Sequence, residues 1–183
     1  AAVGRTPGTF FVDSMGAANY TIPIWAPRGP RGLQPAIALT YNSGQGDGYV
    51  GVGWSISGLS SITRCERTVV QDGAAAPVAL ASNDGYCLDG QRLMLTSAPS
   101  TYGSVGSTYQ TEVATYQNVT AYGSAGNGPA YFVVQAPNGT QYEYGNAATS
   151  STALLMASGT TTALTWLLDK GTDTAGNTMV ITY

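Results

Sequence analysis

The side chains of this chain that could do chemistry are ten carboxylates, two cysteines and a single lysine, and the sequence has no histidine. The lack of histidine excludes Ser-His-Asp and Cys-His catalysis, histidine zinc sites and the usual proton shuttle near neutral pH. A glycosidase would need two carboxylates about 5 to 9.5 Å apart, and the sequence context marks no such pair. We therefore expect no catalytic residue, no metal and no cofactor.

Two short patterns resemble known sites. Gly46–Gly51 matches the dinucleotide fingerprint G-x-G-x-x-G, but that site needs a helix directly after it to hold pyrophosphate. Glycine and tryptophan follow here, which favours a hairpin. Asp173–Ala175 resembles half of an aspartic protease site, but turn-forming residues flank it. Both patterns therefore predict turns.

A calcium site is a more serious alternative to plain turns, because oxygen-rich loops are sufficient to bind this ion. The loops to consider are Asn42–Asp47 and Asn83–Asp89. Neither loop has an acidic residue at every second position, as an EF-hand would require. We expect plain turns, with Asp84 and Asp89 as capping residues.

Cys65 and Cys87 form the one cysteine pair that the sequence allows. A disulfide between them would close a loop of about 20 residues and contribute roughly 3 kcal/mol in the chain-entropy model. A secreted chain favours this bridge, and two free buried thiols are the alternative. Two thiols without histidine do not fill the four positions of a zinc site.

The elements that must position these residues are short strands with period-two alternation, separated by Gly, Pro, Asn, Asp and Ser. The expected strands are Thr9–Val12, Tyr20–Trp25, Ala36–Tyr41, Ser61–Arg64, Arg67–Val70, Tyr86–Leu88, Arg92–Thr96, Thr108–Val113, Asn118–Tyr122, Ala130–Gln135, Thr140–Tyr144, Leu164–Asp169 and Thr178–Tyr183. Ala153–Ala157 is too short for a convincing helix. The pattern predicts an all-β fold, an antiparallel sandwich or curved sheet of many short strands.

A hairpin with many glycines is expected after the strand that contains Ile37, Leu39 and Tyr41. Trp54 and the apolar residues after it supply bulk for a core. Glycine allows the backbones of a hairpin to approach closely. The glycines expected to have this structural role are Gly44, Gly46, Gly48, Gly51 and Gly53.

Composition limits the class of protein. Charged residues make up 9% of the 183 residues, and the net charge is −3, against roughly 25% charged residues in an average soluble domain. Without a cluster of Lys and Arg, nucleic-acid binding is not expected. No apolar run approaches the roughly 20 residues that span a bilayer. We expect a single β domain over residues 1–183, with Thr96–Ser107 as a mobile loop that buries almost nothing.

Several unusual strings carry a family resemblance. They are Gly16–Ile24, Pro27–Gly29 with Gly32–Pro35, Tyr41–Arg64, Asp84–Leu93, Ala125–Phe132 and Gly139–Gly145. In this order the chain resembles an SpvB-type domain, the N-terminal part of SpvB virulence proteins, of the B components of Tc toxins and of many Rhs-repeat polymorphic toxins. The resemblance spans almost the whole chain.

The resemblance implies a noncatalytic structural module of a secreted bacterial toxin. Such domains contribute to the β-shell associated with Rhs repeats and toxin delivery. The ADP-ribosylation of SpvB proteins belongs to a C-terminal domain and is not expected here. The expected partners are the remainder of an SpvB/Rhs-type toxin or copies of the chain itself, outside the bacterial cell. Since family members continue for far longer, we expect the chain to be a leading fragment.

A second hypothesis comes from the final strand, Thr178–Tyr183, which the sequence leaves without a later partner. An open strand edge favours pairing with another chain. An extracellular adhesin or filament subunit that self-assembles through strand edges therefore fits as well. A hydrolase acting through carboxylates is a third hypothesis.

Overall fold

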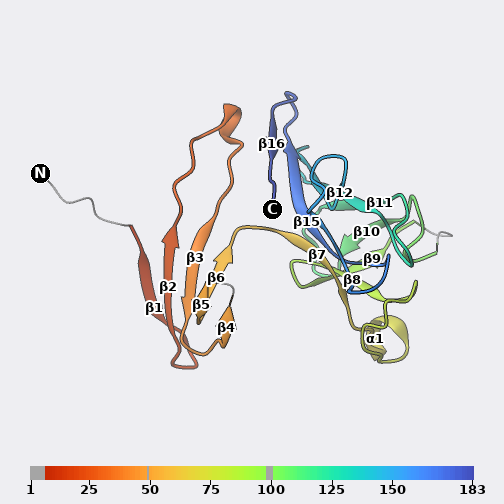
Figure 1. Cartoon of the computed structure of the whole chain (residues 1–183), viewed down its shortest axis with the longest axis horizontal. Coiled ribbons are helices and arrows are strands. Elements are labelled where there is room, and N and C mark those ends of the chain that lie inside the picture. The colour runs from red at the N-terminus through yellow and green to blue at the C-terminus, as the bar shows by residue number, and fades with distance from the viewer. Residues whose placement is uncertain (1–6, 49, 98–100) are drawn as a thin grey trace, which may run out of the picture. The chain divides into compact units, whose positions relative to one another are not determined.

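The computed structural model describes residues 7–48, 50–97 and 101–183, and contacts divide the chain into two compact units (Figure 1). We call Ala1–Leu59 the N-terminal unit and Ser60–Tyr183 the barrel unit. The expectation of one domain over 1–183 stays a prediction, because a division by contacts does not measure whether the units unfold together.

The N-terminal unit contains an antiparallel sheet with strand order β1-β2-β3-β6 (Figure 1). Its elements are β1 (Thr9–Val12), β2 (Ala18–Pro23), a 3₁₀ turn η1 (Pro30–Gly32), β3 (Ala38–Asn42), β4 (Asp47–Gly48), β5 (Gly51–Val52) and β6 (Trp54–Ser57). The short strands β4 and β5 pair with each other in the connection between β3 and β6. The expected hairpin after Tyr41 therefore contains a second, smaller ribbon.

The two faces of this sheet differ in chemistry. A row of aromatic residues, Phe10, Tyr20, Tyr41 and Trp54, crosses all four strands as direct cross-strand partners. Residues on one face alternate with those on the other, so the register assigns every strand residue to a face. The apolar face consists of Phe10, Val12, Ala18, Tyr20, Ile22, Leu39, Tyr41, Trp54 and Ile56. The opposite face is mostly Thr, Ser and Asn, with hydrogen bonds such as Asn42 Nδ2 to Asn19 Oδ1 at 2.7 Å.

The barrel unit is a closed antiparallel barrel. Its elements are β7 (Ser61–Cys65), α1 (Val69–Asp72), β8 (Gly85–Leu88), β9 (Gln91–Leu95), β10 (Thr108–Thr111), β11 (Asn118–Tyr122), β12 (Tyr131–Gln135), β13 (Gln141–Tyr144), β14 (Leu154–Met156), β15 (Ala163–Thr172) and β16 (Thr178–Val180). Neighbouring strands pair in the order β13-β12-β11-β10-β9-β8-β7-β15, and β15 also pairs with β13. This last pairing closes the barrel, and β15 also pairs with β14 and β16. Figure 1 shows β16 beside β15.

The interior of the barrel is filled with side chains, with Tyr86 at the centre of an aromatic cluster. Phe132 and Trp166 each meet the Tyr86 ring edge-on, at centroid distances of 5.4 and 5.5 Å. The buried Trp166 donates its Nε1 hydrogen to the carbonyl of Pro129 at 3.1 Å, which satisfies its one polar atom. Burial raises the pKa of Tyr86 to about 12. Its hydroxyl is therefore neutral at ordinary pH.

The all-β prediction is confirmed, and most expected strands differ from the observed ones by a few residues at their ends. The strand expected at Arg67–Val70 is wrong, because Val69–Asp72 forms the short helix α1. Thr68 caps its N-terminus, and Gly73 ends it with a left-handed φ of 74°. These are ordinary helix start and stop signals. Ala153–Ala157, weighed as a helix, instead contains the strand β14.

The Thr96–Ser107 segment is better anchored than its composition suggested, although residues 98–100 lie outside the described residues. The Tyr102 ring stacks on Tyr86 at a centroid distance of 5.3 Å. Its hydroxyl donates to the carbonyl of Leu93 and accepts from the amide of Tyr86. Ser107 is fully buried. One tyrosine therefore attaches a polar loop to the core.

The glycines expected to shape the hairpin meet different constraints. A Cβ on Gly48 would lie 2.0 Å from the carbonyl oxygen of Trp54, and one on Gly53, with φ of 74°, would lie 2.6 Å from the Tyr41 ring. Gly51 has a φ of 125°, a region L-residues rarely adopt. By contrast, a Cβ on Gly46 meets nothing within 4 Å, and one on Gly44 lies 3.2 Å from the Asn42 side chain. The structural role of the five glycines stays a prediction. The distances indicate that it is strongest at Gly48 and Gly53 and weakest at Gly46.

We expect Gly48→Ala to destabilise the β3–β6 hairpin by about 1–3 kcal/mol, because the added methyl group overlaps a backbone carbonyl. Gly46→Ala is the matched control and should change the free energy by less than about 0.5 kcal/mol. Amide hydrogen exchange of β3 and β6 measures both effects. Equal exchange rates in the two variants would contradict the assignment.

Candidate functional site: the disulfide and the Arg92 network

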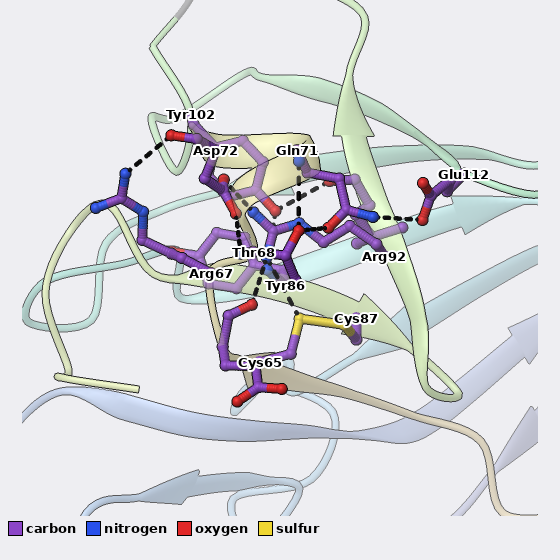
Figure 2. A network of polar contacts seen from close by, with 12 residues as sticks. Cys65, Arg67, Thr68, Gln71, Asp72, Tyr86, Cys87, Arg92, Tyr102 and Glu112 are labelled. Atoms are coloured by element: carbon purple, nitrogen blue, oxygen red, sulfur yellow. Dashed lines mark hydrogen bonds and ion pairs between the residues drawn. A yellow bond between two sulfur atoms is a disulfide. The ribbon is translucent and has the colours of Figure 1, made fainter. Parts of the chain in front are cut away.

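Arg92, on β9, holds the helix α1 against the barrel. Its Nη2 lies 2.7 Å from Asp72 Oδ1, and both side chains are largely buried. Asp72 is the last residue of α1, and its other carboxylate oxygen accepts the amide of Thr68 at the start of that helix. One carboxylate therefore closes the helical turn and pairs with Arg92 (Figure 2).

The other side of the Arg92 guanidinium faces the cysteines. Nη1 donates to the carbonyl of Glu66 at 3.1 Å and lies 3.7 Å from Cys65 Sγ. The guanidinium also lies 5.4 Å from the centroid of the Tyr102 ring, a cation–π distance. A Cβ on Gly85 would lie 1.4 Å from Nη1. Glycine at this position therefore leaves the space that the guanidinium occupies.

The expected disulfide between Cys65 and Cys87 is confirmed, with a Cα–Cα distance of 5.9 Å. Cys65 is the last residue of β7, and Cys87 on β8 pairs in register with Thr63. The bridge therefore crosses two neighbouring strands diagonally. It closes the excursion of the chain that carries α1 (Figure 2).

A pocket of about 420 Å³ opens beside this network. It is lined by Cys65, Glu66, Thr68, Gln71, Cys87, Gly90, Gln91, Arg92, Glu112 and Val113. Gln71 donates to the Glu112 carboxylate at 2.6 Å across the exposed rim. The pocket thus combines a disulfide, a buried guanidinium and surface carboxylates, a set that the sequence analysis did not bring together.

A second buried arginine, Arg64, sits inside the barrel. Its Nη1 lies 3.0 Å from Asp84 Oδ2, and the Arg64 side chain is fully buried. Three further guanidinium hydrogens go to the carbonyls of Ala81, Ala163 and Asn127. Because every partner is far from Arg64 in the chain, no local sequence pattern predicts this site.

The acidic residues expected to cap turns behave differently. Asp84 accepts the amide of Ala79 but is chiefly the partner of Arg64. Asp89 accepts the amide of Ser61 and its neighbour's hydroxyl. Asp89 and Gly90 both have positive φ, as a type I′ hairpin turn requires. The expectation therefore holds for Asp89 and is incomplete for Asp84.

Neither motif-like pattern forms the site that it resembles. In Gly46–Gly51, β4 pairs with β5, Tyr49 lies outside the described residues, and β6 follows where a dinucleotide site would need a helix. The Asp173 carboxylate accepts the amides of Ala175 and Asn177. Asn42 Oδ1 likewise accepts the amide of Gly44 in the loop weighed for calcium. Within residues 7–48, 50–97 and 101–183, no three His, Cys, Asp or Glu residues gather as a metal site would require.

Asp169, on β15, is a fully buried carboxylate. One oxygen accepts the amide of Asn146, and Oδ1 has no hydrogen-bond partner within the described part of the chain. Burial, together with the charge of nearby Glu143, raises the pKa of Asp169 to about 6. The pKa of Glu143 is lowered, against the effect of its own burial, by hydrogen bonds from Asn146 and Lys170. The pKa values of these two neighbouring acids are therefore shifted in opposite directions.

The raised pKa of Asp169 predicts that acid stabilises this part of the barrel. The stabilisation is fully present below about pH 4 and is lost as the pH rises through about 6, with a magnitude of about 3 kcal/mol for two pKa units. Asp169→Asn should remove this pH dependence. Urea unfolding at pH 4 to 8 measures it.

Glu143→Gln is a comparison rather than a neutral control. It removes a stabilisation that is present above pH 4.5 and lost in acid, and by removing a negative charge near Asp169 it should also reduce the acid stabilisation. An unchanged pH profile in Asp169→Asn would overturn the role assigned to Asp169.

Fold and site together define an all-β protein with a filled barrel, one disulfide and buried arginine–carboxylate pairs. A family model described as Salmonella virulence plasmid 65kDa B protein, SpvB, matches residues 12–183. Because the match covers nearly the whole chain, this chain belongs to the SpvB family.

Individual proteins agree with this assignment. The Mono(ADP-ribosyl)transferase SpvB of Salmonella typhimurium is 28% identical over 188 residues, covering 93% of this chain and 30% of that protein. The chain therefore spans less than a third of this relative's length.

Solved structures share the fold. The crystal structure of TcdB2-TccC3 matches with a TM-score of 0.74 and 19% identity, over 98% of this chain and 9% of the other. The N-terminal domain of the effector protein SpvB from Salmonella typhimurium strain LT2 matches with a TM-score of 0.62 and 24% identity, over 82% of this chain and 49% of the other. Among the described residues, no helix is long and apolar enough to cross a membrane.

Proposed function

We propose that the chain is a noncatalytic structural module of a secreted bacterial toxin. It contributes to a β-shell that encloses and delivers the toxic part, and its partner is the remainder of an SpvB/Rhs-type polypeptide. Membership of the SpvB family supports this proposal. The shared fold with part of TcdB2-TccC3 supports it as well.

The observation that carries the proposal is the apolar face of the N-terminal unit. Its nine residues include no charged side chain. Among the described residues of this unit, Gly53 alone is buried, and Val50 lies beside Ile22, Leu39 and Trp54, so the apolar face is only partly covered within its own unit. Sheets are stable when their apolar face is packed against another layer. A module built to be one layer of a larger β-structure meets this requirement.

The barrel unit supports a role without catalysis. Its interior is occupied by Tyr86, Phe132 and Trp166, all fully buried. Its two buried arginines pair with carboxylates, Arg64 with Asp84 and Arg92 with Asp72. Pairs of this kind fix strand positions and leave the charged groups engaged in structure.

The second candidate function is an extracellular adhesin or filament subunit. The sheet order leaves β1 and β6 each with one strand neighbour, and β16 pairs with β15 alone, within the described residues. Such edges can add a strand from another chain. Ordered fibres in electron micrographs of the natural secreted material would favour this function, whereas a closed shell would favour toxin encapsulation.

The layer proposal predicts different effects for two adjacent phenylalanines. Phe10 lies on the apolar face and Phe11 on the opposite face, with exposed fractions of 66% and 55%. In the complete gene product, Phe10→Lys should prevent formation of the protease-resistant assembly, because it places a charge between two apolar layers. Phe11→Lys is the matched control and should assemble normally. Equal behaviour of the two variants in limited proteolysis would contradict the proposal.

The noncatalytic assignment predicts no turnover by the purified chain. Incubation with labelled NAD⁺ and acceptor proteins tests the activity named for the SpvB relative, and a glycoside library tests hydrolysis through carboxylates. We expect no signal above the protein-free blank. Turnover that disappears in Glu66→Gln or Glu112→Gln, the carboxylates at the pocket, would refute the assignment.

A further inference from the structure

The Cys65–Cys87 disulfide forms part of the wall of the pocket beside Arg92. We propose that it is a thiol-exchange site, at which a small thiol such as glutathione attacks Cys87 Sγ and releases Cys65 beside Arg92. This inference concerns the chemistry of the bridge and is independent of the proposed shell function.

Access to the bridge comes from the pocket. Both cysteines line it, together with the polar side chains of Thr68, Gln71 and Gln91. The volume of about 420 Å³ falls within the range of about 300–1,000 Å³ for sites that hold small molecules. Cys65 is half-buried and Cys87 is 8% exposed. A small thiol therefore reaches the bridge through the pocket, which larger reductants do not enter.

Arg92 determines the direction of the exchange. Its Nη1 lies 3.7 Å from Cys65 Sγ, and a neighbouring guanidinium stabilises a thiolate relative to the neutral thiol. In thiol–disulfide exchange, the sulfur that forms the more stable thiolate leaves faster. Cys65 is therefore the leaving group, and Cys87 receives the attacking sulfur.

The exchange proceeds in two balanced steps. In the first, the thiolate of the small thiol forms a bond to Cys87 Sγ, the bond between Cys87 and Cys65 breaks, and its electron pair leaves on Cys65. In the second, another small thiolate attacks the glutathione sulfur of this mixed disulfide. Oxidised glutathione leaves and Cys87 becomes a thiolate. The small thiol is oxidised and the protein bridge is reduced.

Opening the bridge changes what holds α1. Asp72 and Cys65 contact the same guanidinium on different nitrogens, at 2.7 and 3.7 Å. In the oxidised protein the carboxylate is the sole anion of the two, whereas a Cys65 thiolate would add a second negative charge beside Arg92. Exchange at the disulfide is therefore coupled to the ion pair that positions the helix (Figure 2).

The test is the rate of exchange with reduced glutathione under native conditions, followed by alkylation and mass spectrometry of peptides. In the wild-type chain we expect glutathione on Cys87 and the alkyl group on Cys65. Arg92→Gln should slow the exchange by about tenfold, because it removes the charge that stabilises the leaving sulfur. Asp72→Asn should accelerate it by about threefold, because the guanidinium is then less neutralised.

The paired variants separate this role from a purely structural one. If Arg92 only held the fold together, both variants would loosen the pocket and accelerate exchange. The proposal is overturned by acceleration in Arg92→Gln, by glutathione on Cys65 in the wild-type chain, or by a native bridge that does not react. Should Arg92→Gln fail to fold, the position of the glutathione adduct in the wild-type chain still decides the question, because the proposal requires it on Cys87.

Discussion

The burial of the Arg64 guanidinium inside the barrel is the constraint on which the barrel unit depends. A charged group in an apolar interior is very unfavourable unless it is paired and hydrogen-bonded. Four of the five guanidinium hydrogens of Arg64 find acceptors, on the Asp84 side chain and on three backbone carbonyls, of Ala81, Ala163 and Asn127. The strand of Arg64 and three other stretches of the chain, at residues 81–84, 127 and 163, must therefore reach their correct positions together.

The aromatic core completes this arrangement. The Arg64 guanidinium lies 5.6 Å from the Tyr86 ring and 6.0 Å from the Trp166 ring, so two aromatic faces cover a charge that water cannot reach. On the opposite edge of the same cluster, Tyr102 stacks on Tyr86 and lies under Arg92. The stacked rings of Tyr86 and Tyr102 thus connect the two arginines, and the disulfide lies next to Arg92.

The sequence predicted features that depend on neighbouring residues and missed those that depend on distant ones. Alternation located most strands, and the single cysteine pair identified the bridge. Arg64 follows Ile62 by two residues and shares its buried face, but a charged residue in an alternating strand normally faces water. Its acceptors lie far along the chain, so nothing local indicated burial. Tyr102 was missed for a related reason, since its polar loop gives no sign that one ring docks in the core.

β15 joins both ends of the barrel sheet. Its first half pairs with β7 and β14, and its second half with β13 and β16. Ile62 on β7 pairs with Trp166, which lies about a hundred residues later in the chain. Contacts between residues so far apart in sequence form slowly. During translation the early strands leave the ribosome long before their seam partner exists. The barrel therefore cannot close until β15 has emerged from the ribosome.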